Sequence, residues 1–182
     1  MSNAVILAPD SEHPSLSRKG FNLSEFMGKW YVLHSTLPLW KNKKDVAITY
    51  SPKEPSQWLQ FDDTVEYRSE SAASSSKPWT IRGVDVLVGP TDPGRFVPGA
   101  SFQWRGKGLL VFSSSSWQVL GYGDGWAVTF FSKTLFTPAG IDIYSRDKDL
   151  TRDLYDEIML GLSKHEETRK LAEGMFEIKH GD

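Results

Sequence analysis

The stretch NLSEFMGKWY, residues 22–31, decides the fold because a helix-start signal in it runs directly into the start of a strand. Asn22 followed by Glu25 approximates a capping box, which predicts a single helical turn over residues 23–27. Gly28 interrupts this turn, and the aromatic and β-branched residues after it favour an extended strand. We therefore expect the chain to enter a β-sheet at Gly28.

Outward from this stretch, short aromatic and β-branched segments alternate with turn residues as far as Arg146. This pattern is typical of antiparallel sandwiches and barrels. The tight Gly123-Asp124-Gly125 connection is the strongest hairpin signal in the chain. The eight predicted strands are Lys29–Thr36, Val46–Ser51, Trp58–Arg68, Trp79–Val88, Ser101–Arg105, Ser116–Tyr122, Trp126–Ser132 and Ile141–Ser145.

After Arg146 the apolar period becomes helical, with Asp149 or Thr151 as the cap. A second capping-box match, SKHE at residues 163–166, predicts a further short helix that ends near Gly174. The first helix has one apolar stripe, suited to lie against a sheet: Leu150, Leu154, Ile158 and Leu162. The predicted organisation is an N-terminal arm over 1–21, a barrel plus helix over 22–164, and a C-terminal helical extension over 165–182.

Three stretches resemble the lipocalins of the calycin superfamily. FMGKWY at 26–31 looks like the Gly-x-Trp motif that opens the first strand of that family, and DVAITYS at 45–51 resembles its second strand. IYSR at 143–146 looks like the family's last-strand motif. The order and spacing agree over roughly residues 22–164.

This resemblance implies an all-β fold: an eight-stranded antiparallel up-and-down β-barrel with a C-terminal α-helix packed on it. It also implies a barrel base in which Arg146 packs over Trp30 and Gly28 opens the first strand. The chain departs from the family in two places. It has no cysteine for the common disulfide, and a glycine-rich Gly121–Trp126 connection stands where many lipocalins carry a Thr-Asp-Tyr type turn.

The composition excludes several classes of protein. Among 182 residues, 21 Lys and Arg against 23 Asp and Glu give a net charge of −2, and neither sign forms a block, so a nucleic-acid partner is not expected. No stretch approaches the roughly 20 apolar residues of a membrane span. The N-terminal residues lack a signal-peptide pattern and cysteine is absent, so we expect a cytoplasmic monomer or homodimer.

Alternation across each strand predicts which side chains face the barrel interior. If Trp30 and Arg146 point inward, Ile141 and Ile143 point outward beneath the helix. The third strand places apolar residues at odd positions and takes Asp63 inward with them. The predicted ligand-binding residues are Val32, Thr36, Ile48, Tyr50, Leu59, Phe61, Asp63, Val65, Tyr67, Trp79, Ile81, Phe102, Trp104, Trp117 and Val119.

An aromatic content of 13%, with 7 tryptophans, suits a cavity that grips one small hydrophobic molecule of terpenoid or polyketide type. One hypothesis is a carrier that binds, stores or transports this ligand. The other is a cofactor-free cyclase or isomerase, as some lipocalin-like barrels are, including allene oxide cyclase and certain fungal Diels–Alderases. It is slightly favoured because the expected barrel is cytosolic, free of cysteine and has candidate inward His, Asp and Tyr side chains.

On the enzyme hypothesis, His34, Tyr144 and Asp142 are the candidate hydrogen-bond donors or general acid and base. The alternative places His34 at the wet barrel mouth, Asp142 in solvent and Asp63 outside through a bulge. The four histidines lie far apart in sequence, at 13, 34, 165 and 180, so neither a metal site nor a cofactor is expected.

Overall fold

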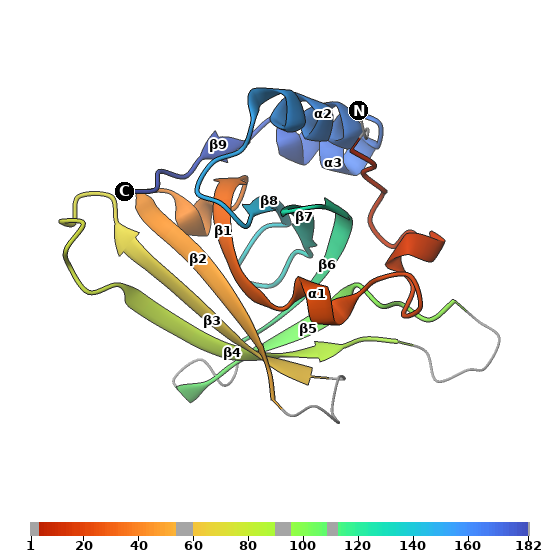
Figure 1. Cartoon of the computed structure of the whole chain (residues 1–182), viewed down its shortest axis with the longest axis horizontal. Coiled ribbons are helices and arrows are strands. Elements are labelled where there is room, and N and C mark those ends of the chain that lie inside the picture. Colours follow the sequence, from red (N-terminus) through yellow and green to blue (C-terminus); the bar gives the residue numbers. More distant parts are fainter. Residues whose placement is uncertain (1–3, 54–59, 90–95, 109–112, 182) are drawn as a thin grey trace.

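The computed structural model describes residues 4–53, 60–89, 96–108 and 113–181. In this part of the chain, eight antiparallel strands follow one another around a closed barrel, because the last strand and the second both pair with the first (Figure 1). The predicted up-and-down barrel is therefore confirmed. The strands are β1 (Gly28–Ser35), β2 (Lys43–Pro52), β3 (Gln60–Ser69), β4 (Trp79–Leu87), β5 (Ser101–Gly106), β6 (Ser114–Gly123), β7 (Trp126–Phe131) and β8 (Gly140–Ser145).

The base of the barrel is closed by the predicted contact between the two ends of the fold. A single helical turn, α1 (Leu23–Phe26), is capped by the Asn22 side chain. The Arg146 guanidinium lies 3.5 Å from the ring centroid of Trp30 and donates to backbone carbonyls of α1 and β1. Gly28 joins α1 to β1 with a φ of +95°, a conformation that favours glycine.

Two helices cover the outer face of β7 and β8 (Figure 1). They are α2 (Arg152–Ser163), whose Thr151 cap accepts from the backbone N–H of Leu154, and α3 (Glu166–Ala172). Among the described residues, neither these nor any other helix is long and apolar enough to cross a membrane. The interface between barrel and helices contains Ile6, Leu120, Trp126, Val128, Ile141, Ile143, Ile158 and Leu162, so the predicted outward direction of Ile141 and Ile143 is confirmed.

The end of the chain is extended, although the sequence predicted a helical extension over 165–182. The chain is helical only to Ala172, and a short strand β9 (Phe176–Glu177) then pairs with β1 at His34 and Ser35. At this level β1 has already separated from β2, because their last pair is Tyr31 with Ala47. β9 therefore supplies hydrogen-bond partners to backbone groups of β1 that would otherwise be unpaired.

Candidate ligand site inside the barrel

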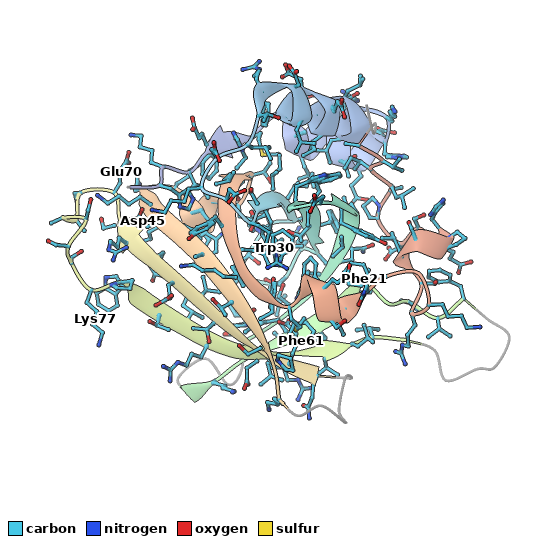
Figure 2. The ribbon with its side chains drawn as sticks, in the orientation of Figure 1. Phe21, Trp30, Asp45, Phe61, Glu70 and Lys77 are labelled. Carbon is cyan, nitrogen blue, oxygen red and sulfur yellow. The ribbon has the colours of Figure 1, made fainter. Side chains whose placement is uncertain are left out.

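The predicted inward faces of most strands are confirmed. Figure 2 shows Trp30 and Phe61 within the barrel, and β3 carries Phe61, Asp63, Val65 and Tyr67 on one face. Leu59 lies outside the described residues. The predicted lining residues that the structure places in the interior cluster are Val32, Ile48, Tyr50, Phe61, Val65, Phe102, Trp117 and Val119, with Tyr67, Ile81 and Trp104 partly buried against it.

Aromatic rings fill the closed half of the barrel. Tyr50 on β2 stacks on Trp117 on β6, with 5.6 Å between ring centroids and 14° between planes. Since β2 and β6 lie on opposite sides of an eight-stranded barrel, this contact crosses the interior. Phe102 joins the stack at 4.5 Å from Trp117 and 5.3 Å from Phe61. This aromatic layer (Tyr50, Phe61, Phe102 and Trp117) is core packing and does not leave an open cavity at that level.

The open half of the barrel is reached by solvent. Tyr67, Ile81, Trp104 and Phe131 point inward but remain partly exposed, in contrast to the buried aromatic layer. The short helix η2 (Pro38–Trp40) lies at this end, and its Trp40 ring meets Tyr67 edge-on at 6.0 Å. A molecule entering from this end contacts these side chains first.

Two carboxyl groups on neighbouring strands form a polar floor to this open half. Asp63 on β3 is 7% exposed and Asp85 on β4 is 0% exposed. Asp85 Oδ1 accepts a hydrogen bond of 2.7 Å from Trp117 Nε1. Two further oxygens of the pair, Asp63 Oδ1 and Asp85 Oδ2, are buried and have no hydrogen-bond partner in the described part of the chain.

Burial sets the protonation of this pair. It raises the pKa of Asp85 to about 7, although the hydrogen bond from Trp117 and the neighbouring Asp63 oppose the rise. Burial raises the pKa of Asp63 well above its usual value, and the charge of Asp85 raises it further. Asp85 therefore ionises before Asp63, because the Asp85 carboxylate keeps its hydrogen bond from the Trp117 indole, and its charge then holds the proton on Asp63 to higher pH.

A second group of polar side chains lies on β8 and β1. Asp142 accepts from the Ser35 hydroxyl at 2.5 Å and from Trp40 Nε1 at 3.3 Å, and burial raises its pKa to about 7. The hydroxyl groups of Tyr144 and Tyr50 lie 3.4 Å apart, and burial raises the pKa of both. Of the polar side chains predicted to cluster inside the barrel, Asp63, Asp142, Tyr50 and Tyr144 are buried, Tyr67 is partly buried and His34 lies outside.

Two predicted inward directions on β1 are wrong, because a β-bulge between Val32 and His34 shifts the alternation. The His34 ring packs on Tyr155 of α2, 4.4 Å between centroids, outside the barrel, and burial lowers its pKa. Thr36 Oγ1 accepts from the backbone N–H of Ile141 and does not line the interior. On β4, Trp79 was also a predicted lining residue. It shares a face with Tyr67, but its side chain is 69% exposed at the rim of the barrel.

Asp85, Ser35 and Trp40 are not among the predicted site residues. Either face of the fourth predicted strand could be inward on the sequence alone, and Asp85 lies with Trp79 and Ile81 on one of those two faces. Ser35 faces inward only because of the bulge, and Trp40 reaches Asp142 from a connection between strands. The sequence carried no signal for either of these contacts.

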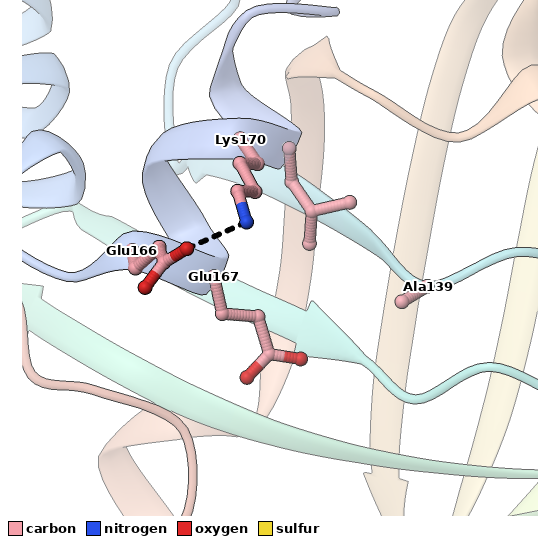
Figure 3. Close-up of a pocket in the computed structure, with 5 residues that line it drawn as sticks. Ala139, Glu166, Glu167 and Lys170 are labelled. Carbon is pink, nitrogen blue, oxygen red and sulfur yellow. Dashed lines mark hydrogen bonds and ion pairs between the residues drawn. The ribbon is translucent and has the colours of Figure 1, made fainter.

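Two surface hollows lie outside the barrel. One, of about 450 Å³, is lined by Ala139, Leu171 and three charged residues of α3, of which Lys170 and Glu166 pair at 2.6 Å (Figure 3). The other, of about 300 Å³, lies between α1 and Leu87. In the described residues no group of three His, Cys, Asp or Glu side chains is placed to hold a metal ion.

The closed barrel, its Arg146 and Trp30 base and the helix on its outer face are the features of the lipocalin fold. Solved structures with this fold include lobster apocrustacyanin A1, 15% identical with a TM-score of 0.63 over 100% of this chain and 93% of that chain. Insecticyanin from the tobacco hornworm Manduca sexta is 15% identical with a TM-score of 0.62 over 89% and 82%. The siderocalin Ex-FABP is 14% identical with a TM-score of 0.55 over 87% and 99%. No family model and no curated protein sequence matches the chain.

Proposed function

We propose that this protein binds one small, largely hydrophobic, ring-bearing molecule in the open half of its barrel. The observation that carries the proposal is the contrast between the two halves. Tyr67, Trp104 and Phe131 point inward yet stay partly exposed, whereas the rings below them are buried against one another. Similarity to structures named as a siderocalin with dual ligand specificities and as insecticyanin supports binding, but not a particular ligand.

The apolar area that a ligand can bury indicates how tightly the partly exposed rings of the open half can bind it. A ring system of indole size buries on the order of 200 Å² of apolar surface, which contributes about 5 kcal/mol. The loss of translational and rotational freedom offsets most of this gain. Ring contacts alone therefore give weak binding, and a polar contact with the floor is needed for tight and selective binding.

The proposal is tested by incubating the purified protein with an organic extract of its source organism and identifying retained compounds by mass spectrometry. We expect one class of ring-bearing compound to be retained by the native protein and reduced at least about fivefold by Trp104→Ala. The matched control is Leu135→Ala, which removes an exposed apolar side chain from the β7–β8 connection. Retention that is equal in the native protein, both variants and a boiled sample would contradict binding in the barrel.

A second candidate function is cofactor-free cyclisation or isomerisation of the bound molecule. The observation in its favour is that the Asp63 carboxyl is 7% exposed at the edge of the solvent-reached half, where burial raises its pKa well above its usual value, as a general acid requires. Tyr144 and Asp142 remain candidates for hydrogen bonding to the reacting molecule. His34 is no longer one, because its ring lies beneath α2.

The two functions are separated by following the retained compound over time. Cyclisation or isomerisation gives a product of identical mass and different retention time, formed by the native protein and slowed at least about tenfold by Asp63→Asn. Recovery of the compound unchanged from both proteins supports the binder and excludes the reaction for that compound.

A further inference from the structure

The floor of the open half lacks a counter-charge. Asp63 is paired in register with Gly83, two residues from Asp85, so the two carboxyl groups are diagonal neighbours on one face of the sheet. Each has a buried oxygen with no partner, and no lysine, arginine or histidine is buried anywhere in the described residues. An unpaired buried carboxylate is costly unless something donates to it.

Aromatic residues neighbour this carboxyl pair. Tyr50 is paired with Asp63 in register, Trp104 is paired with Asp85, and Trp117 donates its indole N–H to Asp85. Gly83 makes the approach of Trp104 feasible, because a Cβ at that position would lie 2.0 Å from the indole nitrogen. Carboxylate oxygens attract a cation, and a cation that reaches them over the face of a neighbouring aromatic ring gains a further attraction.

We propose that the bound molecule carries a protonated amine or amidine group, which donates to Asp63 and Asp85 while its ring system packs on Trp104 and Tyr67. This inference rests on the proposed function and specifies the chemical class of its ligand. A protonated amine has enough N–H donors to satisfy both unpaired oxygens through charge-assisted hydrogen bonds. A neutral hydrocarbon leaves them unpaired, and a carboxylate ligand adds repulsion.

Binding of a cation also requires a change in protonation. Burial favours the protonated form of both carboxyl groups, so a protonated amine forms charge-assisted hydrogen bonds with both only when they have lost their protons to solvent. The other titratable groups that face the pair are Tyr50 on β2 and, on β8, Tyr144 and Asp142. Burial raises the pKa of all three, which favours their uncharged, protonated forms. None of these supplies a positive charge.

The test uses three probes that share a naphthalene ring: naphthylmethylamine, naphthalenemethanol and naphthoate. Calorimetry near neutral to slightly alkaline pH should give an amine Kd at least about tenfold lower than that of the alcohol, and weaker binding still for the carboxylate. Asp63→Asn and Asp85→Asn should each raise the amine Kd about tenfold and leave the alcohol Kd unchanged. Asp62→Asn is the matched control, because Asp62 lies on the outer face of β3 and pairs with Lys107.

Each outcome has a definite meaning. Equal binding of amine and alcohol, unaffected by Asp63→Asn, overturns the cation proposal and leaves the proposed function intact. Failure of all three probes to bind contradicts the proposed function itself. If the variants do not fold, the native protein still decides: amine affinity should rise as pH increases from mildly acidic to mildly alkaline, with proton release seen as a dependence of the heat on buffer. A flat pH profile without proton release overturns the proposal.

Discussion

At the scale of single residues, the buried carboxyl groups connect protonation to stability. Burial raises the pKa of Asp85 and of Asp142 to about 7 in the folded protein, above the value in the unfolded chain. A raised folded-state pKa stabilises the fold fully below the unfolded pKa, and this contribution is lost as pH rises through about 7. We therefore expect the free energy of unfolding to fall as pH increases from about 4 to about 8.

The variant that tests this is Asp85→Asn, which keeps an acceptor for Trp117 but cannot ionise. Since one pKa unit corresponds to about 1.4 kcal/mol, the variant should gain about 1–3 kcal/mol on the native protein between mildly acidic and mildly alkaline pH. Urea denaturation at several pH values measures the difference. The same pH slope in both proteins would show that Asp85 is not protonated on folding.

Arg146 is the second residue whose role can be measured. Its guanidinium lies over the Trp30 ring and donates to the carbonyl oxygens of Glu25, Lys29 and Met27. Lysine has a point charge and cannot reproduce this planar fork, so Arg146→Lys should lower the free energy of unfolding by about 1–3 kcal/mol.

The control for Arg146 is Arg152→Lys, which alters an exposed ion pair with Asp156 one turn along α2. Exposed helical pairs contribute little, so this change should stay below about 0.5 kcal/mol. Equal effects of the two substitutions in urea denaturation would contradict a structural role for the Arg146 contact.

At the scale of elements, the C-terminal segment is a part of the barrel wall. Ile178 is 3% exposed and belongs to the interior cluster. Its backbone N–H donates to the Leu33 carbonyl, and the backbone carbonyl of Lys179 accepts from the backbone N–H of Asp45. Ile178→Ala should therefore lower the free energy of unfolding by about 2–4 kcal/mol. It should also speed hydrogen exchange in β1 between Leu33 and Ser35, because β9 covers that edge.

Leu160→Ala is the matched control on a neighbouring element, because Leu160 is 63% exposed on α2. It should change stability by less than about 0.5 kcal/mol and leave exchange in β1 as it is. Unaltered exchange in Ile178→Ala would mean that the end of the chain is only loosely attached.

The barrel strands and the barrel base could be predicted from the sequence, whereas the bulge in β1 and the strand β9 could not. The barrel strands could be predicted because period-two patterns and turn residues recur along β1 to β8, and the barrel base because Gly28, Trp30 and Arg146 stand in family order. The bulge in β1 has no local signal, so His34 and Thr36 were assigned to the wrong face. β9 spans two residues, and only an unpaired edge elsewhere in the fold explains it.

At the scale of the whole molecule, the aromatic layer divides the barrel into a filled closed half and an open half that solvent reaches. Tyr50 and Trp117 meet across the interior, and Phe102 packs against Trp117 and Phe61 beneath the polar floor. Because the aromatic layer closes the barrel beneath the carboxyl pair, it should limit the length of a ligand. We expect naphthylmethylamine to bind the native protein and the longer biphenylmethylamine to bind at least about tenfold more weakly.

Phe102→Ala tests the layer directly, because it removes a buried ring without touching the carboxyl pair. A cavity of this size should lower the free energy of unfolding by about 3–5 kcal/mol, and the space should let the longer probe extend downward. Calorimetry should then show biphenylmethylamine binding at least about tenfold tighter than to the native protein, with naphthylmethylamine changed less than about twofold. Equal binding of both probes to the native protein would mean that the rings move aside, so that the aromatic layer does not limit the length of a ligand.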